Sequence, residues 1–109
     1  MVEKSSAGND SLSVRVDADG TIVVRGDIDI AGGPILDDAI RDAVRIGPMV
    51  LDLAAVSFID SSGLRSLLNA SRRAQDHGGT VLLRAVGPEV VRLLEITGTT
   101  ERFHIERRT

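Results

Sequence analysis

The sequence contains no cysteine, tryptophan or tyrosine, and only Phe58 and Phe103 supply large aromatic rings. The absence of cysteine excludes a disulfide framework, a thiolate zinc site and a cysteine nucleophile, and it fits a protein of the reducing cytoplasm. Because Phe, Trp and Tyr make up only 2% of the chain, little surface remains on which single-stranded nucleic acid could stack. A formal net charge of -3 gives no overall attraction to nucleic acid or to an anionic membrane.

Long apolar runs and nucleotide-binding signatures are also missing. No apolar stretch approaches the roughly 20 residues that cross a bilayer, and residues 1–10 lack the apolar centre of a signal peptide. We therefore predict a flexible tail over residues 1–10 and a single domain over residues 11–109. The chain has neither the glycine run of dinucleotide-binding folds nor a P-loop, so no nucleotide cofactor is expected.

Hydrophobic periodicity predicts the order of the structural elements. Alternating apolar and polar residues over 12–16 and 21–25, with a tight turn between them, predict an antiparallel hairpin. Apolar residues at helical spacing, with glycine stops, predict helices over 34–46, 61–77 and 88–97. Short apolar runs predict strands over 49–53, 80–85 and 103–105. The order β-β-α-β-α-β-α-β predicts a single α/β domain with a mixed sheet, because strand–helix–strand units favour parallel pairing.

The polar residues that follow Ile59 are the most informative part of the chain. Asp60 or Ser61 is suited to cap the helix that begins there, and Ser62 lies in its first turn. A helix N-terminus carries unpaired N–H groups and partial positive charge, so it also suits a phosphorylated hydroxyl. From the residues alone, both interpretations stay open: a simple cap, or a phosphorylation site that switches a docking surface.

The sequence contains only weak signals of an enzyme active site or a metal site. The pair Ser62-Gly63 lacks the first glycine of an esterase nucleophile elbow, and no spacing ties His77 or His104 to Ser62. Three aspartates could converge at one sheet edge and hold a hard cation, but turn and capping roles explain them more simply. Dispersed arginines on the second helix are typical of a solvated face. The sequence therefore predicts a protein that is not an enzyme and binds no metal or cofactor.

The run Phe58-Ile59-Asp60-Ser61-Ser62-Gly63-Leu64 resembles the signature of bacterial anti-sigma factor antagonists, which belong to the STAS-domain family. Gly26-Asp27-Ile28-Asp29 resembles the segment after the second strand of that family, and Val50-Leu51-Asp52-Leu53 resembles its central strand. Residues 92–98, followed by Phe103, resemble its closing helix and strand. The resemblance extends from about Leu12 to Ile105.

The resemblance implies a function in transcription regulation and the stress response. In that family the second serine of the pair accepts phosphate from an ATP-binding serine kinase that is also the anti-sigma factor. The unphosphorylated antagonist binds this kinase and releases a sigma factor, and a serine phosphatase resets the cycle. The resemblance thus implies that Ser62 is the phosphoacceptor of a cytoplasmic protein with no nucleic-acid or membrane partner. It also implies that the partner contacts Asp27, Asp29, Asp60, Ser61, Gly63 and Arg65.

Two features depart from the family pattern. The run Ala31-Gly32-Gly33-Pro34 replaces the Thr-Ala-Pro-like start of the first helix, and two glycines loosen that loop. Residues 106–109 leave no room for the further C-terminal helix that the family often carries, so a monomer and a weak homodimer both stay open. One alternative function is a STAS-like accessory or scaffold module, without phosphorylation, in a transporter or signalling complex. The other is a small metal-dependent or serine enzyme.

Overall fold

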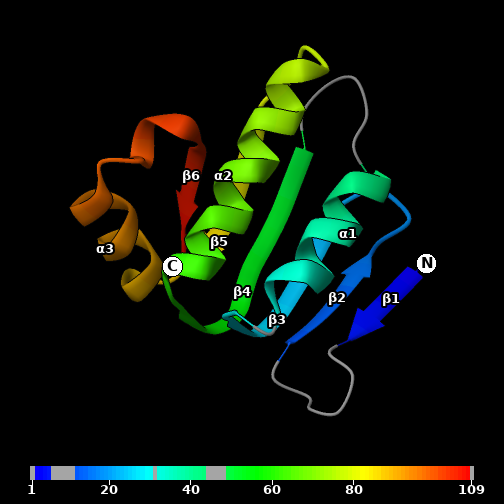
Figure 1. Cartoon of the computed structure of the whole chain (residues 1–109), viewed down its shortest axis with the longest axis horizontal. Coiled ribbons are helices and arrows are strands. Elements are labelled where there is room, and N and C mark those ends of the chain that lie inside the picture. The colour runs from blue at the N-terminus through cyan, green and yellow to red at the C-terminus, as the bar shows by residue number, and fades with distance from the viewer. Residues whose placement is uncertain (1, 6–11, 31, 44–48, 109) are drawn as a thin grey trace.

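The computed structural model describes residues 2–5, 12–30, 32–43 and 49–108 (Figure 1). Within these residues the chain forms one six-stranded sheet whose strand order is the sequence order. The strands are β1 (Val2–Ser5), β2 (Leu12–Val16), β3 (Ile22–Ile28), β4 (Met49–Ile59), β5 (Val81–Val86) and β6 (His104–Arg107). The helices are α1 (Gly33–Ala43), α2 (Ser61–Asp76) and α3 (Pro88–Thr97), with a 3-10 turn η1 (Thr100–Arg102).

The sheet is mixed, as the sequence predicts. Strands β1, β2 and β3 pair antiparallel, whereas β3, β4, β5 and β6 pair parallel. Because the strand order never reverses, right-handed crossovers place α1, α2 and α3 on the same face of the sheet. Figure 1 shows α1 and α2 lying over that face, with the start of α2 at the end of the sheet where β4 finishes. The predicted α/β fold with an antiparallel opening hairpin is therefore confirmed.

An aliphatic core holds the helices against the sheet. Leu36 of α1, Leu67 of α2 and Leu94 of α3 are completely buried, as are inward-facing residues of the central strands such as Leu51 and Leu83. Each fully buried side chain of this size stabilises the fold by about 1.5–3 kcal/mol relative to leaving it exposed. The core thus fixes the position of α2, and with it the N-terminal turn that carries the serine pair.

The N-terminal segment differs from the prediction. The sequence predicts a flexible tail over residues 1–10, whereas Val2–Ser5 forms β1 and pairs antiparallel with β2, Val2 opposite Val16. The edge of β2 offers a row of N–H and C=O groups, which a short segment of almost any composition can pair. Residues 6–10 of the predicted tail, and residues 44–46 of the first predicted helix, lie outside the described residues.

Strand β4 is longer than predicted, because two changes in its register with β3 interrupt the alternation of buried and exposed residues. The sequence predicts a strand over 49–53, but β4 runs from Met49 to Ile59. Its pairing with β3 slips by one residue on each occasion, so β4 contains two bulges. Beyond Leu53 the buried residues are Val56 and Ile59, and the two residues between each buried position are exposed. This spacing of three does not fit the alternation by which a strand is recognised in a sequence.

Candidate functional site

The N-terminus of α2 is capped by Asp60. The backbone of Asp60 is extended, its carboxylate accepts a hydrogen bond from the Gly63 N–H at 3.0 Å, and its carbonyl accepts one from the Leu64 N–H at 2.9 Å. A side-chain cap of this kind contributes about 1 kcal/mol. Asp60 therefore performs the capping role that the sequence leaves open between Asp60 and Ser61. Neither serine hydroxyl has a hydrogen bond to another described residue.

Gly63 brings the first turn of α2 into direct contact with the sheet. A Cβ atom at this position would lie 2.1 Å from the Ile28 carbonyl oxygen and 2.8 Å from the Ile59 side chain, so only glycine fits. The resemblance implies a partner contact for Gly63, and in the structure the residue is buried and packs against β3 and β4. The close approach leaves Ser61 exposed and Ser62 half-buried at the surface.

The aspartates of the β3–α1 segment lie at the same edge of the sheet. Asp27 is paired in register with Phe58 of β4 and accepts a hydrogen bond from the Ser57 hydroxyl at 3.2 Å. Asp29 organises the turn that leads into α1, because its carboxylate accepts from the Gly32 N–H at 3.0 Å and its carbonyl accepts from the Gly33 N–H at 2.8 Å. The carboxyl ends of neighbouring parallel strands therefore gather Asp27, Asp29 and Asp60, as the sequence predicts.

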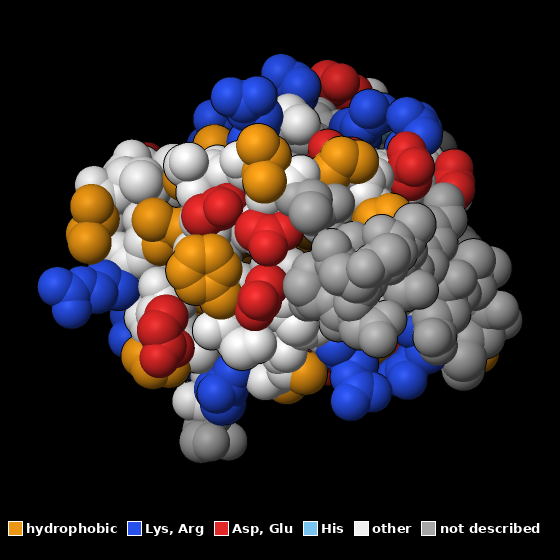
Figure 2. Space-filling model, turned by 60° about the horizontal axis from the view of Figure 1, so that its bottom comes forward, with side chains coloured by type: hydrophobic (Ala, Val, Ile, Leu, Met, Phe, Trp, Pro, Cys, Tyr) orange, Lys and Arg blue, Asp and Glu red, His pale blue; other side chains and the backbone are white. Residues whose placement is uncertain are grey.

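This end of the molecule is acidic and partly apolar. Residues 26–33 and 57–63, the stretches that form it, contain three aspartates and no lysine or arginine. Figure 2 shows the same end of the molecule, where acidic side chains gather around an exposed hydrophobic one. Arg65 is exposed on α2, just after the serine turn, and is the arginine nearest in sequence to Ser62. A partner that binds here therefore meets a negative surface bordered by one cation of α2.

The histidines are too far from Ser62 to act on its hydroxyl. His77 caps the opposite end of α2, about 22 Å from Ser62 at the rise of an α-helix. His104 begins β6, at the amino edge of the parallel strands, whereas Ser62 follows their carboxyl edge. In the described part of the chain, no group of three or more acidic or histidine side chains is arranged to hold a metal ion. The same residues include no helix that is long and apolar enough to cross a membrane.

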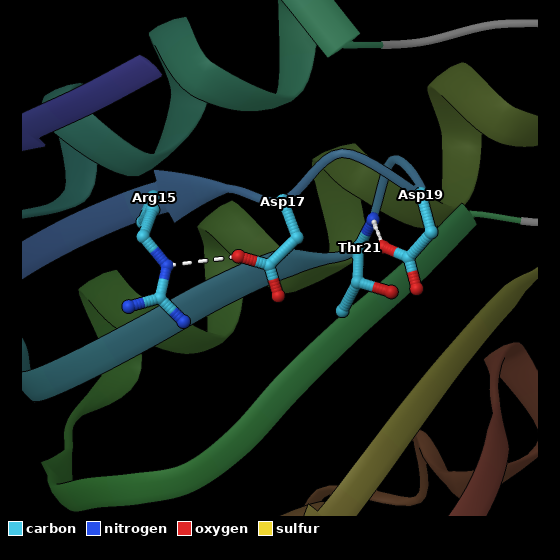
Figure 3. Close-up of polar contacts among 4 residues, drawn as sticks. All are labelled: Arg15, Asp17, Asp19 and Thr21. Carbon is cyan, nitrogen blue, oxygen red and sulfur yellow. Dashed lines mark hydrogen bonds and ion pairs between the residues drawn. The ribbon is translucent and has the colours of Figure 1, made fainter. Parts of the chain in front are cut away.

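A second polar cluster lies at the turn between β2 and β3, at the opposite end of the strands (Figure 3). The Arg15 side chain donates to the Asp17 carboxylate at 2.9 Å, and the Thr21 N–H donates to the Asp19 carboxylate at 2.9 Å. Hydrogen bonds from the backbone and side chain of Thr21, aided by the charge of Arg84, hold the pKa of Asp19 below its ordinary value. These contacts close a turn, and they give the cluster a structural role.

Comparison with known proteins identifies a family for this chain. A family model described as "STAS domain" matches residues 12–109. The chain is 25% identical over 87 residues to the anti-sigma-B factor antagonist of Bacillus subtilis (strain 168), an alignment that covers 79% of this chain and 80% of that protein.

Solved structures of similar proteins have the same fold. An anti-sigma factor antagonist from Mycobacterium paratuberculosis is 31% identical, with a TM-score of 0.67, and the match covers 94% of this chain and 90% of that one. The Bacillus cell fate determinant SpoIIAA in its phosphorylated form is 20% identical, with a TM-score of 0.63, over 86% of this chain and 89% of that one. The second of these shows likeness of fold alone.

Proposed function

Because the chain belongs to the STAS domain family, we propose that it is an anti-sigma factor antagonist controlled by phosphorylation of Ser62. In this proposal the unphosphorylated protein binds an anti-sigma factor that is also an ATP-dependent serine kinase, and a sigma factor is released in the cytoplasm. Relatives that cover most of the chain are anti-sigma factor antagonists, which supports this function over an enzymatic one.

The observation that carries the proposal is the way α2 presents Ser62. Asp60 already caps the helix, so the serine hydroxyl is not needed to satisfy the backbone. Ser62 is half-buried in the first helical turn, and its hydroxyl has no hydrogen-bond partner among the described residues. A phosphate at this position would meet the positive end of the helix dipole, which stabilises a negative charge by about 0.3–1 kcal/mol. The domain should therefore stay folded when Ser62 is phosphorylated.

The same phosphate would change the docking surface sharply. It adds about -1.5 to -2 charges and three acceptor oxygens to an edge that already carries Asp27, Asp29 and Asp60. During transfer, the kinase holds the phosphates of its own nucleotide against the Ser62 hydroxyl. Once the phosphoryl group is on Ser62, it faces the anionic nucleotide that remains in the kinase, and like charges repel. We therefore expect the phosphorylated protein to dissociate and a serine phosphatase to restore binding.

The exposed residues around Ser62 have distinct proposed roles. Ser61 and Arg65 lie on the outer surface of α2 and would contact the kinase directly. Asp27 and Asp29 supply negative charge from the β3–α1 side of the edge. The nucleotide belongs to the kinase in this scheme, which agrees with a chain that has no P-loop.

Phosphosite mapping by mass spectrometry tests this proposal on protein taken from its own cells, both growing and stressed. We expect phosphate on Ser62 and a change in its occupancy between the two conditions. Complete coverage of the peptide with no phosphate in either condition would favour the alternative, an accessory or scaffold module of a transporter or signalling complex.

Binding by variants of the serine pair supplies the complementary test. Ser62→Ala should bind the kinase as wild type does but accept no phosphate, whereas Ser62→Asp should bind at least about tenfold more weakly because it mimics part of the phosphate charge. Ser61→Asp is the matched control for added charge at the neighbouring residue. Wild-type affinity in the Ser62→Asp variant would contradict the switch.

A further inference from the structure

Two large hydrophobic side chains are exposed beside the candidate site. Among the described residues, the exposed large hydrophobic side chains are Ile30 at 78%, Phe58 at 51% and Ile96 at 71%. Ile30 follows β3 by two residues and Phe58 is the penultimate residue of β4, whereas Ile96 lies on α3. Phe58 is unusual because it is an exposed aromatic residue on β4, a strand that lies inside the sheet between β3 and β5.

The second bulge of β4 is the reason that Phe58 is exposed. Gly26 pairs with Val56, but the next residue, Asp27, pairs with Phe58, so Ser57 is the additional residue on β4. With regular alternation after the buried Val56, Phe58 would face the helices and Ile59 would face solvent. The bulge reverses these two orientations. Ile59 points inward, against the position of Gly63, and Phe58 points to the other face of the sheet.

Carboxylates lie at the same end of the sheet as this exposed ring. Asp27 is its register partner on β3, and the Ser57 hydroxyl donates to the Asp27 carboxylate at 3.2 Å. Asp29 and Asp60 follow the ends of β3 and β4, so they add negative charge at the same edge. Since neither stretch that forms this edge contains a lysine or arginine, the formal charge of the two stretches together is negative. Figure 2 shows the resulting combination of acidic and hydrophobic side chains on one surface.

We propose that Phe58 is the apolar anchor of an acid-bordered docking surface, and that the partner offers an apolar pocket lined at its rim by lysine or arginine. The proposal rests on the function proposed above, and the partner is the same anti-sigma kinase. Partly buried aromatic anchors carry much of the energy of protein interfaces, whereas charges at the rim mainly direct association. Phe58 and Ser62 lie on opposite faces of the sheet, at the end where β3 and β4 finish, so the kinase extends around that end.

This arrangement separates binding from phosphoryl transfer. Phe58 lies on the face of the sheet away from the helices, and Ser62 lies on α2. Loss of the ring should therefore weaken docking but leave the orientation of the Ser62 hydroxyl unchanged. The kinetic signature is a raised KM for the antagonist with an unchanged kcat.

The test measures phosphorylation of Ser62 by each purified anti-sigma kinase of the source organism with ATP. Phe58→Ala should raise KM by about tenfold or more while kcat stays within about twofold, and Phe58→Leu, which keeps an apolar side chain, should recover most of the affinity. Ile96→Ala is the matched control, because it truncates an exposed hydrophobic side chain on α3 and should leave both constants unchanged. Asp27→Asn should lower the association rate and flatten its dependence on salt.

The outcomes separate the two proposals. If Ser62 of the wild type is phosphorylated and Phe58→Ala has a KM within about twofold of wild type, the anchor is overturned and the function stands. If no kinase binds or phosphorylates the wild type, the proposed function is overturned and the anchor with it. Thermal melts establish whether each variant is folded. If Phe58→Ala does not fold, the KM of Phe58→Leu still tests the anchor.

Discussion

Replacing Gly63 with alanine should destabilise the domain although alanine is the better helix former. The added methyl group would lie 2.1 Å from the Ile28 carbonyl oxygen and 2.8 Å from the side chains of Ile28 and Ile59. The first of these neighbours is backbone within β3, so no side-chain rotation can relieve the contact. The first turn of α2 must therefore move away from the sheet.

The size of the effect follows from two opposing terms. Alanine gains about 0.8–1.0 kcal/mol over glycine in a helix interior, whereas forcing an extra methyl group into a well-packed site costs about 1–3 kcal/mol, occasionally more. The contact with the carbonyl oxygen is far inside van der Waals distance, so we expect the upper part of that range. A net loss of about 2 kcal/mol corresponds to a decrease in Tm of about 8–16 °C for a domain of this size.

Thermal unfolding followed by circular dichroism measures this loss. Gly78→Ala is the matched control, because Gly78 has φ of +75° and a Cβ atom there would meet no other atom within 4 Å, so this variant reports conformational strain without a steric contact. We expect Gly63→Ala to lower Tm more than Gly78→Ala does. A Gly63→Ala variant as stable as wild type would refute the close packing of α2 on the ends of β3 and β4.

Two further predictions concern single aspartates. Asp60→Ala removes the cap of α2 and should cost about 1 kcal/mol, whereas Asp60→Asn should keep most of the stability because asparagine caps equally well; equal Tm values for Asp60→Ala and wild type would contradict the capping role. The pKa of Asp19 is lowered by its hydrogen bonds to Thr21 and by the charge of Arg84, so its carboxylate stabilises the fold above its unfolded pKa, and this contribution is lost as pH falls through the folded pKa. Urea unfolding between pH 7 and acid pH should therefore show a smaller loss of stability on acidification for Asp19→Asn than for wild type, and parallel pH profiles would count against this interpretation.

The elements whose signals are local could be predicted from the sequence. The alternation over residues 12–16, the helical spacing of the leucines in α2 and the glycine that ends α3 each lie within one short segment. Strand β1 could not be predicted, because its formation depends on the open edge of β2. The full length of β4 was also inaccessible, since its bulges are defined only by the register with β3.

The candidate site shows the same division. The cap at Asp60 and the gathering of three aspartates at one edge follow from chain order and strand direction. The burial of Gly63 depends on how closely α2 approaches Ile28, and the exposure of Phe58 depends on the extra residue at Ser57. Neither the distance nor the register follows from the strict alternation by which a strand is predicted. The change from a spacing of two to a spacing of three between the inward residues of β4 is the trace that the bulges leave in the sequence.

The sequential strand order has a consequence for how the domain folds. Every strand of the described sheet after β1 pairs with the strand that precedes it in the chain, and α1, α2 and α3 each cross between two adjacent strands. Each step of assembly therefore joins neighbouring segments of the chain, so no step has to span the whole domain. A chain of this topology can add strands in the order in which the ribosome releases them. The serine turn of α2 would then acquire its place before the last two strands have joined the sheet.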